Sequence, residues 1–265
     1  LTGQTTIGPN DAGTGANVTG TGTVAWLNSG NALSDNGSYA TAALTASGVT
    51  TSNYLRTTNY GFNIPTNATV QGIQVTVGRF QDNIGTGNDV RDVEVRLLKA
   101  NALTGNNNAN TTIEWPTTET PATYGSTSDL WGTTWTPSDI NASGFGVSLV
   151  ANSDNNRTAS VDYIQITVTY IPTQTYITSG TTSFNIPEGV NSVTVECWGA
   201  GAGGSNRNGA AGGGGAGAYT KGTLSNLIPG TSISITVGAG GGVGLPTSSP
   251  GNVSSATYGA NTITA

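Results

Sequence analysis

Apolar and polar residues alternate in short runs along the first two thirds of the chain. The clearest run covers residues 73–77, in which Ile73, Val75 and Val77 share one face of an extended segment. Similar runs follow at residues 92–97, 146–150 and 161–168. Gly, Asn, Asp or Pro bounds each run, and this combination predicts short β-strands joined by turns.

Helical patterns are nearly absent, and only residues 137–141 have the composition of a short helical turn. Several short strands with two different faces predict an antiparallel β-sandwich, because their apolar faces can then share one core. We therefore predict an all-β chain in which residues 24–171 form a jelly-roll-like sandwich. A segment of about 150 residues is long enough to bury such a core.

The remaining segments are assigned from composition. Residues 1–23 contain few apolar positions and predict an N-terminal arm or linker, and the proline-containing residues 172–178 predict a second linker. Residues 179–265 predict a second β unit, in which Cys197 is expected to be a small buried apolar residue. Its last strand pattern ends without a closing turn, so we expect the unit to be truncated or completed by another chain.

The sequence Phe-Asn-Ile-Pro occurs twice, at residues 62–65 and 184–187. Each copy precedes a short turn and an alternating strand. We expect a corner that limits an edge strand and leads the chain into the core. The sequences around the two copies do not otherwise align.

A glycine-rich run at residues 199–217 lies between two strand patterns and has few side chains with which to build a core or a pocket. Glycine loses more backbone entropy on folding than other residues, so an ordered run requires close backbone packing. We expect a contact surface here, and at Gly213 and Gly215 we expect room for hydrogen atoms only. A passive, disordered loop is the alternative. The residues expected to form this surface are Gly203, Gly204, Gly212, Gly213, Gly214 and Gly215.

Composition narrows the functional classes. Charged residues make up 8% of the chain and histidine is absent, which removes the usual acid–base side chain and any Ser-His-Asp triad. A net charge of −6 argues against nucleic-acid binding, which needs a basic stripe. The sequence contains no run of about 18 apolar residues, so we expect no insertion into a membrane. We therefore expect no enzyme activity and no cofactor.

Three aspartates, Asp82, Asp89 and Asp92, fall within eleven residues and could hold a structural Ca²⁺ with backbone carbonyl groups. Their spacing fits no EF-hand loop, so a solvated turn is the favoured interpretation. Four aromatic residues offer a candidate sugar-stacking surface, and the favoured alternative is that they pack the core of the sandwich. These residues are Trp115, Tyr124, Trp131 and Trp135.

Motifs in the last third of the chain carry a resemblance to a known family. FNIPEGVNSVTVECWGAGAGG, GGGGAGAYTKGTL, IPGTSISITVGAGGG and SSATYGANTITA resemble the glycine-rich domain of phage tail fibres and some bacterial surface proteins, over residues 179–265. The resemblance implies a jelly-roll-like pair of sheets with loops that pack as polyglycine-II-type helices. Residues 24–171 are similar to β-sandwich modules of phage structural and secreted bacterial proteins, which implies no defined activity.

These observations predict a structural or adhesive subunit of an extracellular fibre or virion appendage. The expected partners are copies of the chain or other fibre subunits, and a glycan or protein receptor on a cell surface. A subunit of a bacterial surface filament and a carbohydrate-binding module of a secreted protein are the alternatives.

Overall fold

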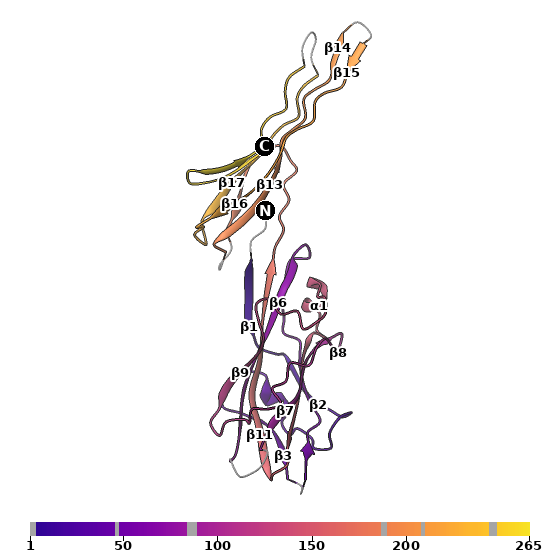
Figure 1. Cartoon of the computed structure of the whole chain (residues 1–265), viewed down its shortest axis with the longest axis vertical. Coiled ribbons are helices and arrows are strands. Elements are labelled where there is room, and N and C mark those ends of the chain that lie inside the picture. The colour runs from indigo at the N-terminus through magenta and orange to yellow at the C-terminus, as the bar shows by residue number, and fades with distance from the viewer. Residues whose placement is uncertain (1–3, 46–47, 84–88, 187–189, 208–209, 244–247) are drawn as a thin grey trace. The chain divides into compact units, whose positions relative to one another are not determined.

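The computed structural model describes residues 4–45, 48–83, 89–186, 190–207, 210–243 and 248–265. Apart from a 3-10 turn, η1 (Ser29–Ala32), and a short helix, α1 (Pro137–Asn141), every regular element in these ranges is a strand. The prediction of an all-β chain is therefore confirmed. The chain divides into two compact units, Thr6–Tyr170 and a second unit that comprises Ile171–Ala265 and Leu1–Thr5 (Figure 1).

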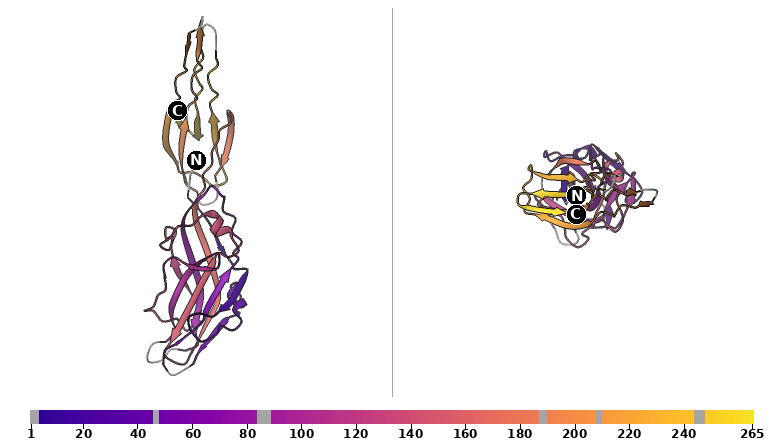
Figure 2. Two further views of the ribbon diagram at one scale, coloured as in Figure 1. Left: turned by 90° about the vertical axis from the view of Figure 1, so that its right-hand side faces the viewer. Right: turned by 90° about the horizontal axis from the view of Figure 1, so that it is seen from above.

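The first unit is a sandwich of two sheets (Figures 1 and 2). One sheet has the order β1-β11-β6-β9, with β3 also paired to β11. Its strands are β1 (Thr5–Asn10), β3 (Ala40–Leu44), β6 (Thr69–Gln81), β9 (Thr120–Gly125) and β11 (Arg157–Ile171). The other sheet has the order β2-β5-β10-β7-β8, with β4 also paired to β10. Its strands are β2 (Thr14–Val18), β4 (Thr50–Thr51), β5 (Tyr54–Thr58), β7 (Arg91–Lys99), β8 (Ala102–Thr104) and β10 (Gly146–Ser153).

One hydrophobic core fills the space between these sheets. Ile73, Val75 and Val77 of β6 are buried in it, as their alternation predicted. Val147 and Leu149 of β10 belong to the same cluster. Alternate positions along both strands therefore meet in the middle of the sandwich, because successive side chains of a strand point to opposite faces.

The predicted helical turn is also present as α1. Thr136 caps its first turn: the Thr136 hydroxyl accepts a hydrogen bond from the Asp139 amide, and the Asp139 carboxylate accepts one from the Thr136 amide. At the end of the helix, the Asn141 side chain donates to the Ile64 carbonyl and accepts from the Ile64 amide, each at 2.8 Å. The turn is thus tied to the first Phe-Asn-Ile-Pro corner.

In both copies of this sequence the isoleucine lies in a core, whereas Pro187 of the second copy lies outside the described residues. Ile64 is 1% exposed in the first unit and Ile186 is 2% exposed in the second. In the first copy the residues before the proline form no regular strand, whereas in the second Phe184 and Asn185 end β12 (Gly180–Asn185). The shared feature is therefore the buried isoleucine rather than an edge strand.

The prediction of an N-terminal arm over residues 1–23 is wrong for the strands β1 and β2. β1 pairs with β11, and β2 pairs with β5 in a register that sets Ala16 opposite Arg56. Backbone hydrogen bonds make these pairings, so a strand at the edge of a sheet can form from Gly, Thr and Asn with few apolar side chains. Of the apolar residues in this stretch, Ala12 belongs to the described core and Ile7 packs against it.

The second unit contains a sheet of order β12-β17-β18-β19 and a separate pair, β13–β16. The additional strands are β13 (Ser192–Trp198), β16 (Tyr219–Ser225), β17 (Ser232–Val237), β18 (Ser255–Tyr258) and β19 (Asn261–Thr264). Val195, Ile235 and Cys197 lie in its small hydrophobic core, so the prediction for Cys197 is confirmed. Tyr176 packs against the same core, and residues 172–178 therefore belong to this unit rather than to a free linker.

Candidate functional site

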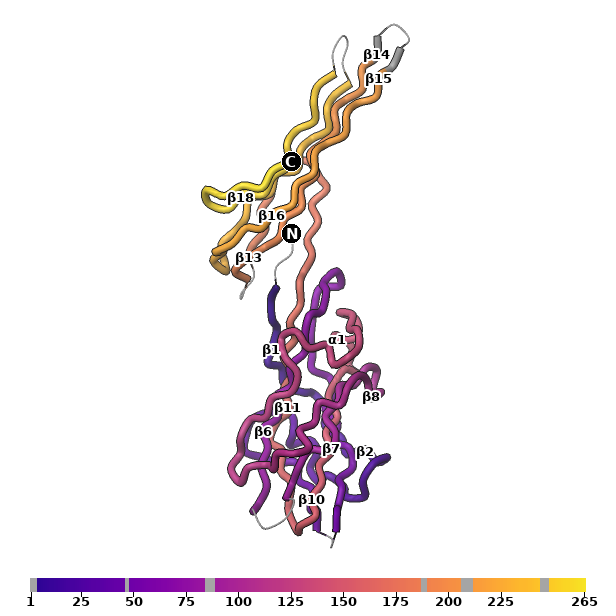
Figure 3. The backbone as a smooth tube through the Cα atoms, viewed as in Figure 1, coloured from indigo at the N-terminus to yellow at the C-terminus, as the bar shows by residue number. Residues whose placement is uncertain are grey.

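The glycine-rich run contributes two of four extended segments of the second unit that lie side by side (Figure 3). Segment A (residues 199–204) follows β13, and segment B (residues 212–218) leads into β16. Segment C (residues 238–243) follows β17, and segment D (residues 248–254) leads into β18. A small hairpin of β14 (Ser205–Arg207) and β15 (Ala210–Gly212) joins A to B. We call the four segments the glycine bundle.

Segment A is the centre of the glycine bundle because it hydrogen-bonds to all three other segments. Toward segment B, the Gly199 amide donates to the Ala218 carbonyl (2.8 Å) and the Ala202 amide to the Gly215 carbonyl (3.0 Å). Toward segment D, the Ala200 amide donates to the Asn252 carbonyl and the Gly203 amide to the Ser249 carbonyl, each at 3.1 Å. From segment C, the Gly241 amide donates to the Gly201 carbonyl (2.8 Å). The direction of bonding therefore repeats every third residue: toward B, then D, then C. This is the period of a threefold extended helix without internal hydrogen bonds, and it differs from the twofold period of a strand.

Glycine is required here for the close approach of backbones. None of the described glycines of the bundle has a positive φ, so the left-handed conformation is not the reason for their use. A Cβ on Gly214 would overlap the Ala202 carbonyl oxygen, and a Cβ on Gly217 would overlap that of Gly199. A Cβ on Gly203 would overlap the carbonyl oxygen of Gly242.

This packing buries some of the six glycines of the predicted contact surface and leaves the others exposed. Gly203 is buried between segments and does not belong to the surface, and Gly204 is half-buried. Gly212, Gly213, Gly214 and Gly215 are exposed along segment B. A Cβ on Gly213 or Gly215 would meet no atom within 4 Å, so the expectation that only hydrogen atoms fit there is wrong. These two residues face outward, whereas Gly214 faces segment A.

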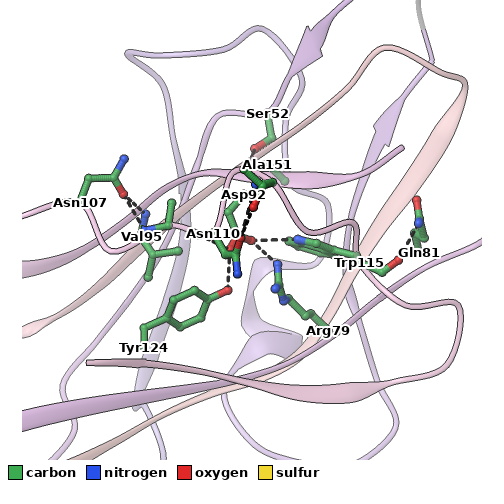
Figure 4. A network of polar contacts seen from close by, with 12 residues as sticks. Ser52, Arg79, Gln81, Asp92, Val95, Asn107, Asn110, Trp115, Tyr124 and Ala151 are labelled. Atoms are coloured by element: carbon green, nitrogen blue, oxygen red, sulfur yellow. Dashed lines mark hydrogen bonds and ion pairs between the residues drawn. The ribbon is translucent and has the colours of Figure 1, made fainter. Parts of the chain in front are cut away.

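The four aromatic residues considered as a sugar-stacking surface are buried in the first unit. Trp115 and Tyr124 surround the carboxylate of Asp92 (Figure 4). The Trp115 indole donates to Asp92 Oδ1 and the Tyr124 hydroxyl donates to Asp92 Oδ2, each at 2.9 Å. Arg79 forms a buried ion pair with Asp92, and its guanidinium lies 4.8 Å from the centre of the Trp115 ring. Burial and the neighbouring Asp92 carboxylate raise the pKa of Tyr124.

The indole N–H groups of the other two tryptophans also have hydrogen-bond partners. Trp131 Nε1 donates to the Ile73 carbonyl at 2.9 Å, and Trp135 Nε1 donates to the Leu130 carbonyl at 3.0 Å. Their indole N–H groups are therefore paired with backbone carbonyl groups, and that of Trp131 joins two distant segments of the first unit. The core-packing interpretation of this aromatic group holds, and the sugar-stacking interpretation is wrong.

The three aspartates considered for Ca²⁺ are not brought together into one cluster. Asp92 binds Arg79, whereas Asp89 pairs with Arg157 at 2.8 Å. Asp82 accepts a hydrogen bond from the Thr158 amide at 3.0 Å. The two buried carboxylates, Asp92 and Asp89, are thus paired with the buried Arg79 and the half-buried Arg157, which offsets the cost of removing their charges from water.

A different group of carboxylates could hold a cation. Oxygen atoms of Asp35, Glu119 and Asp162 lie within 4.8 Å of one another, the one such group among the described residues. Burial and the charges of Asp162 and Asp35 raise the pKa of Glu119. The buried Asp162 already accepts hydrogen bonds from the Asn36 and Gly37 amides. Residues from three distant parts of the sequence form this group, so no local sequence motif predicts it.

An exposed aromatic pair lies at the base of the glycine bundle. Trp198 is the last residue of β13 and Tyr219 is the first of β16, and the two are direct cross-strand partners. Their ring centres lie 5.2 Å apart. This pair was not predicted from the sequence, although a signal was present. Val195 and Cys197 alternate toward the core, and this alternation directs Trp198 to the opposite face.

Comparison with known proteins gives one match. The sequence profile of a family described as a glycine-rich domain matches residues 177–265, the part of the chain that contains the glycine bundle and its sheets. None of the curated proteins and none of the solved structures matches the chain. Within the described residues, no helix has the length and apolar character needed to cross a membrane.

Proposed function

We propose that this protein is a non-enzymatic structural or adhesive subunit of an extracellular fibre or virion appendage, similar to those of phage tail fibres. The glycine bundle carries this proposal. It is an ordered, extended structure built from backbone contacts, and it presents almost no chemistry of its own. The absence of histidine from the sequence supports a non-enzymatic role.

Segment B is the best candidate for a contact between copies. Its residues are exposed, and the two hydrogen bonds that join it to segment A use its carbonyl groups, those of Gly215 and Ala218. Among the bonds of the described residues, none is donated by the amides of residues 213–218. A row of unpaired amides without covering side chains is a template for another chain, as at the edge of a sheet.

The test compares assembly of the full chain with that of a Gly213→Val/Gly215→Val variant. Both positions are open, so the variant should keep its fold but hold a neighbouring backbone away from segment B. We expect the wild-type chain to form oligomers or filaments in sedimentation velocity and negative-stain micrographs, and the variant to lose them. Gly30→Val is the matched control, because Gly30 is exposed and equally open but lies in the first unit. A wild-type chain that stays monomeric at high concentration contradicts the proposal.

The same contacts suit a subunit of a bacterial surface filament. A micrograph of the native particle separates that assignment from a tailed virion. The exposed Trp198 and Tyr219 pair favours a second function, that of a carbohydrate-binding module of a secreted protein. A monomer that binds oligosaccharides and forms no assembly would support that alternative.

A further inference from the structure

The exposed faces of Trp198 and Tyr219 form a platform on the glycine-rich unit. Trp198 is 62% exposed and Tyr219 is 52% exposed, and their ring planes are tilted by 43°. The residues beyond them, Gly199 and Ala218, carry no side chain large enough to cover either ring. Two large aromatic side chains that remain together in water are typical of a binding surface.

A polar pair lies beside this platform. Glu196 and Lys221 are also cross-strand partners, two residues away from the aromatic pair and therefore on the same face. Lys221 Nζ lies 3.0 Å from Glu196 Oε1. The hydrogen bond with Lys221 lowers the pKa of Glu196, and the hydrogen bond with Glu196 raises that of Lys221. Both groups are therefore ionised near neutral pH, and together they add no net charge.

Trp198 also lines a cleft of about 470 Å³, which extends the platform. The cleft follows β13 on the side away from β16 and reaches β17, β18 and Tyr176. Its volume is within the range of ligand pockets, roughly 300–1,000 Å³. Most of its polar side chains are hydroxyls, which both donate and accept hydrogen bonds. Besides the phenol of Tyr176, these hydroxyls belong to Thr173, Thr175, Thr194, Thr236, Ser254 and Ser255.

These features select one class of ligand. We propose that the Trp198–Tyr219 platform and the adjoining cleft bind a neutral glycan. A sugar ring offers an apolar C–H face to an aromatic ring and a rim of hydroxyls to Glu196, Lys221 and the threonines. A purely apolar partner would bury these polar groups without hydrogen bonds, at a cost in free energy. The inference rests on the proposed adhesive function, for which this site supplies the contact with a receptor.

Fluorescence of the full chain reports on this site selectively. Trp198 is the only one of the five tryptophans that is exposed; the other four are at most 6% exposed. The probes are neutral hexasaccharides of glucose, mannose, galactose and N-acetylglucosamine, titrated to about 10 mM so that a dissociation constant of about 1 mM still gives near-saturation. We expect a saturable change in tryptophan emission with at least one of them.

Three variants test the assignment by calorimetric titration. Trp198→Ala and Tyr219→Ala should each weaken binding by about tenfold or more, as loss of a central aromatic contact does. Ile228→Ala is the control: Ile228 is 62% exposed in the same unit, does not line the cleft, and its variant should bind normally. Unchanged circular dichroism spectra and melting temperatures show that each variant is folded.

Three outcomes would overturn the inference: no saturable binding of any of the four probes, binding that survives Trp198→Ala, or an oligomer that Trp198→Ala dissociates without sugar. The last outcome would assign the platform to a second copy of the chain. Assembly is measured separately by sedimentation. A chain that assembles but binds no sugar contradicts this inference alone, whereas a chain that binds sugar but never assembles contradicts the proposed fibre role.

Discussion

Two neighbouring glycines of segment B should respond in opposite ways to the same substitution. Gly214 faces segment A, and a methyl group there would overlap the Ala202 carbonyl oxygen. Gly213 faces open space. We therefore predict that Gly214→Ala separates segment B from segment A, whereas Gly213→Ala leaves the glycine bundle intact.

The magnitude follows from the hydrogen bonds that hold the two segments together. Separation breaks the bonds from Gly199 to Ala218 and from Ala202 to Gly215. Each contributes roughly 0.5–1.5 kcal/mol net, so Gly214→Ala should cost about 1–3 kcal/mol. Gly213→Ala should instead stabilise the fold by about 0.4–1 kcal/mol, because alanine reduces the entropy of the unfolded chain.

Amide hydrogen exchange measured by NMR distinguishes the two variants at single residues. In Gly214→Ala, the amides of Gly199 and Ala202 should exchange about 5- to 150-fold faster, the factor that corresponds to 1–3 kcal/mol. The amides of Ala200 and Gly203 donate to segment D and should change less, which provides a control within the same molecule. Exchange in Gly213→Ala should be unchanged or slower throughout segment A.

Equal effects of the two substitutions would refute this reasoning. So would rapid exchange at Gly199 and Ala202 in the wild-type chain, since the bonds between A and B would then not persist in solution. In that case the glycine-rich run would be the passive loop considered from the sequence.

Three further predictions concern the first unit. Asp92→Ala should lower the free energy of unfolding, measured in urea, by about 3–5 kcal/mol, because it leaves Arg79 buried without a counter-charge. The control is Asp82→Ala at an exposed carboxylate, which should change that free energy by about 0.5 kcal/mol or less. Thr136→Ala should cost about 1 kcal/mol by removing the cap of α1, and equal melting temperatures of variant and wild type would contradict it. The raised pKa of Glu119 means that its ionisation opposes folding, so this penalty is absent at low pH and grows as pH rises from the unfolded pKa through the folded one. Glu119→Gln should therefore raise the melting temperature at pH 7 and change it little below about pH 4; the opposite pH dependence would show that the carboxylate is stabilised by the fold.

Local pattern determined most of the secondary structure. The period-two alternation around Ile73 and Val75 fixed a strand and its buried face, because side chains of a strand alternate whatever its partners are. Thr136, Pro137 and Asp139 fixed a capped helical turn through contacts within four residues. The glycine-rich run indicated that, where ordered, it must pack backbone against backbone, because it has few side chains to make other contacts.

Tertiary structure decided which residues meet, and that information is not local. Residues 5–18 lack an apolar pattern, and they became strands because β11 and β5 offered them backbone partners. The sequence alone does not distinguish the environments of Trp115 and Trp198. Asp92 and the core bury the first, whereas the second ends its strand beside glycine and stays in water. Likewise, only the position of Ala202 across the glycine bundle makes Gly214 irreplaceable and leaves Gly213 free, since contacts between distant segments determine where a Cβ can fit.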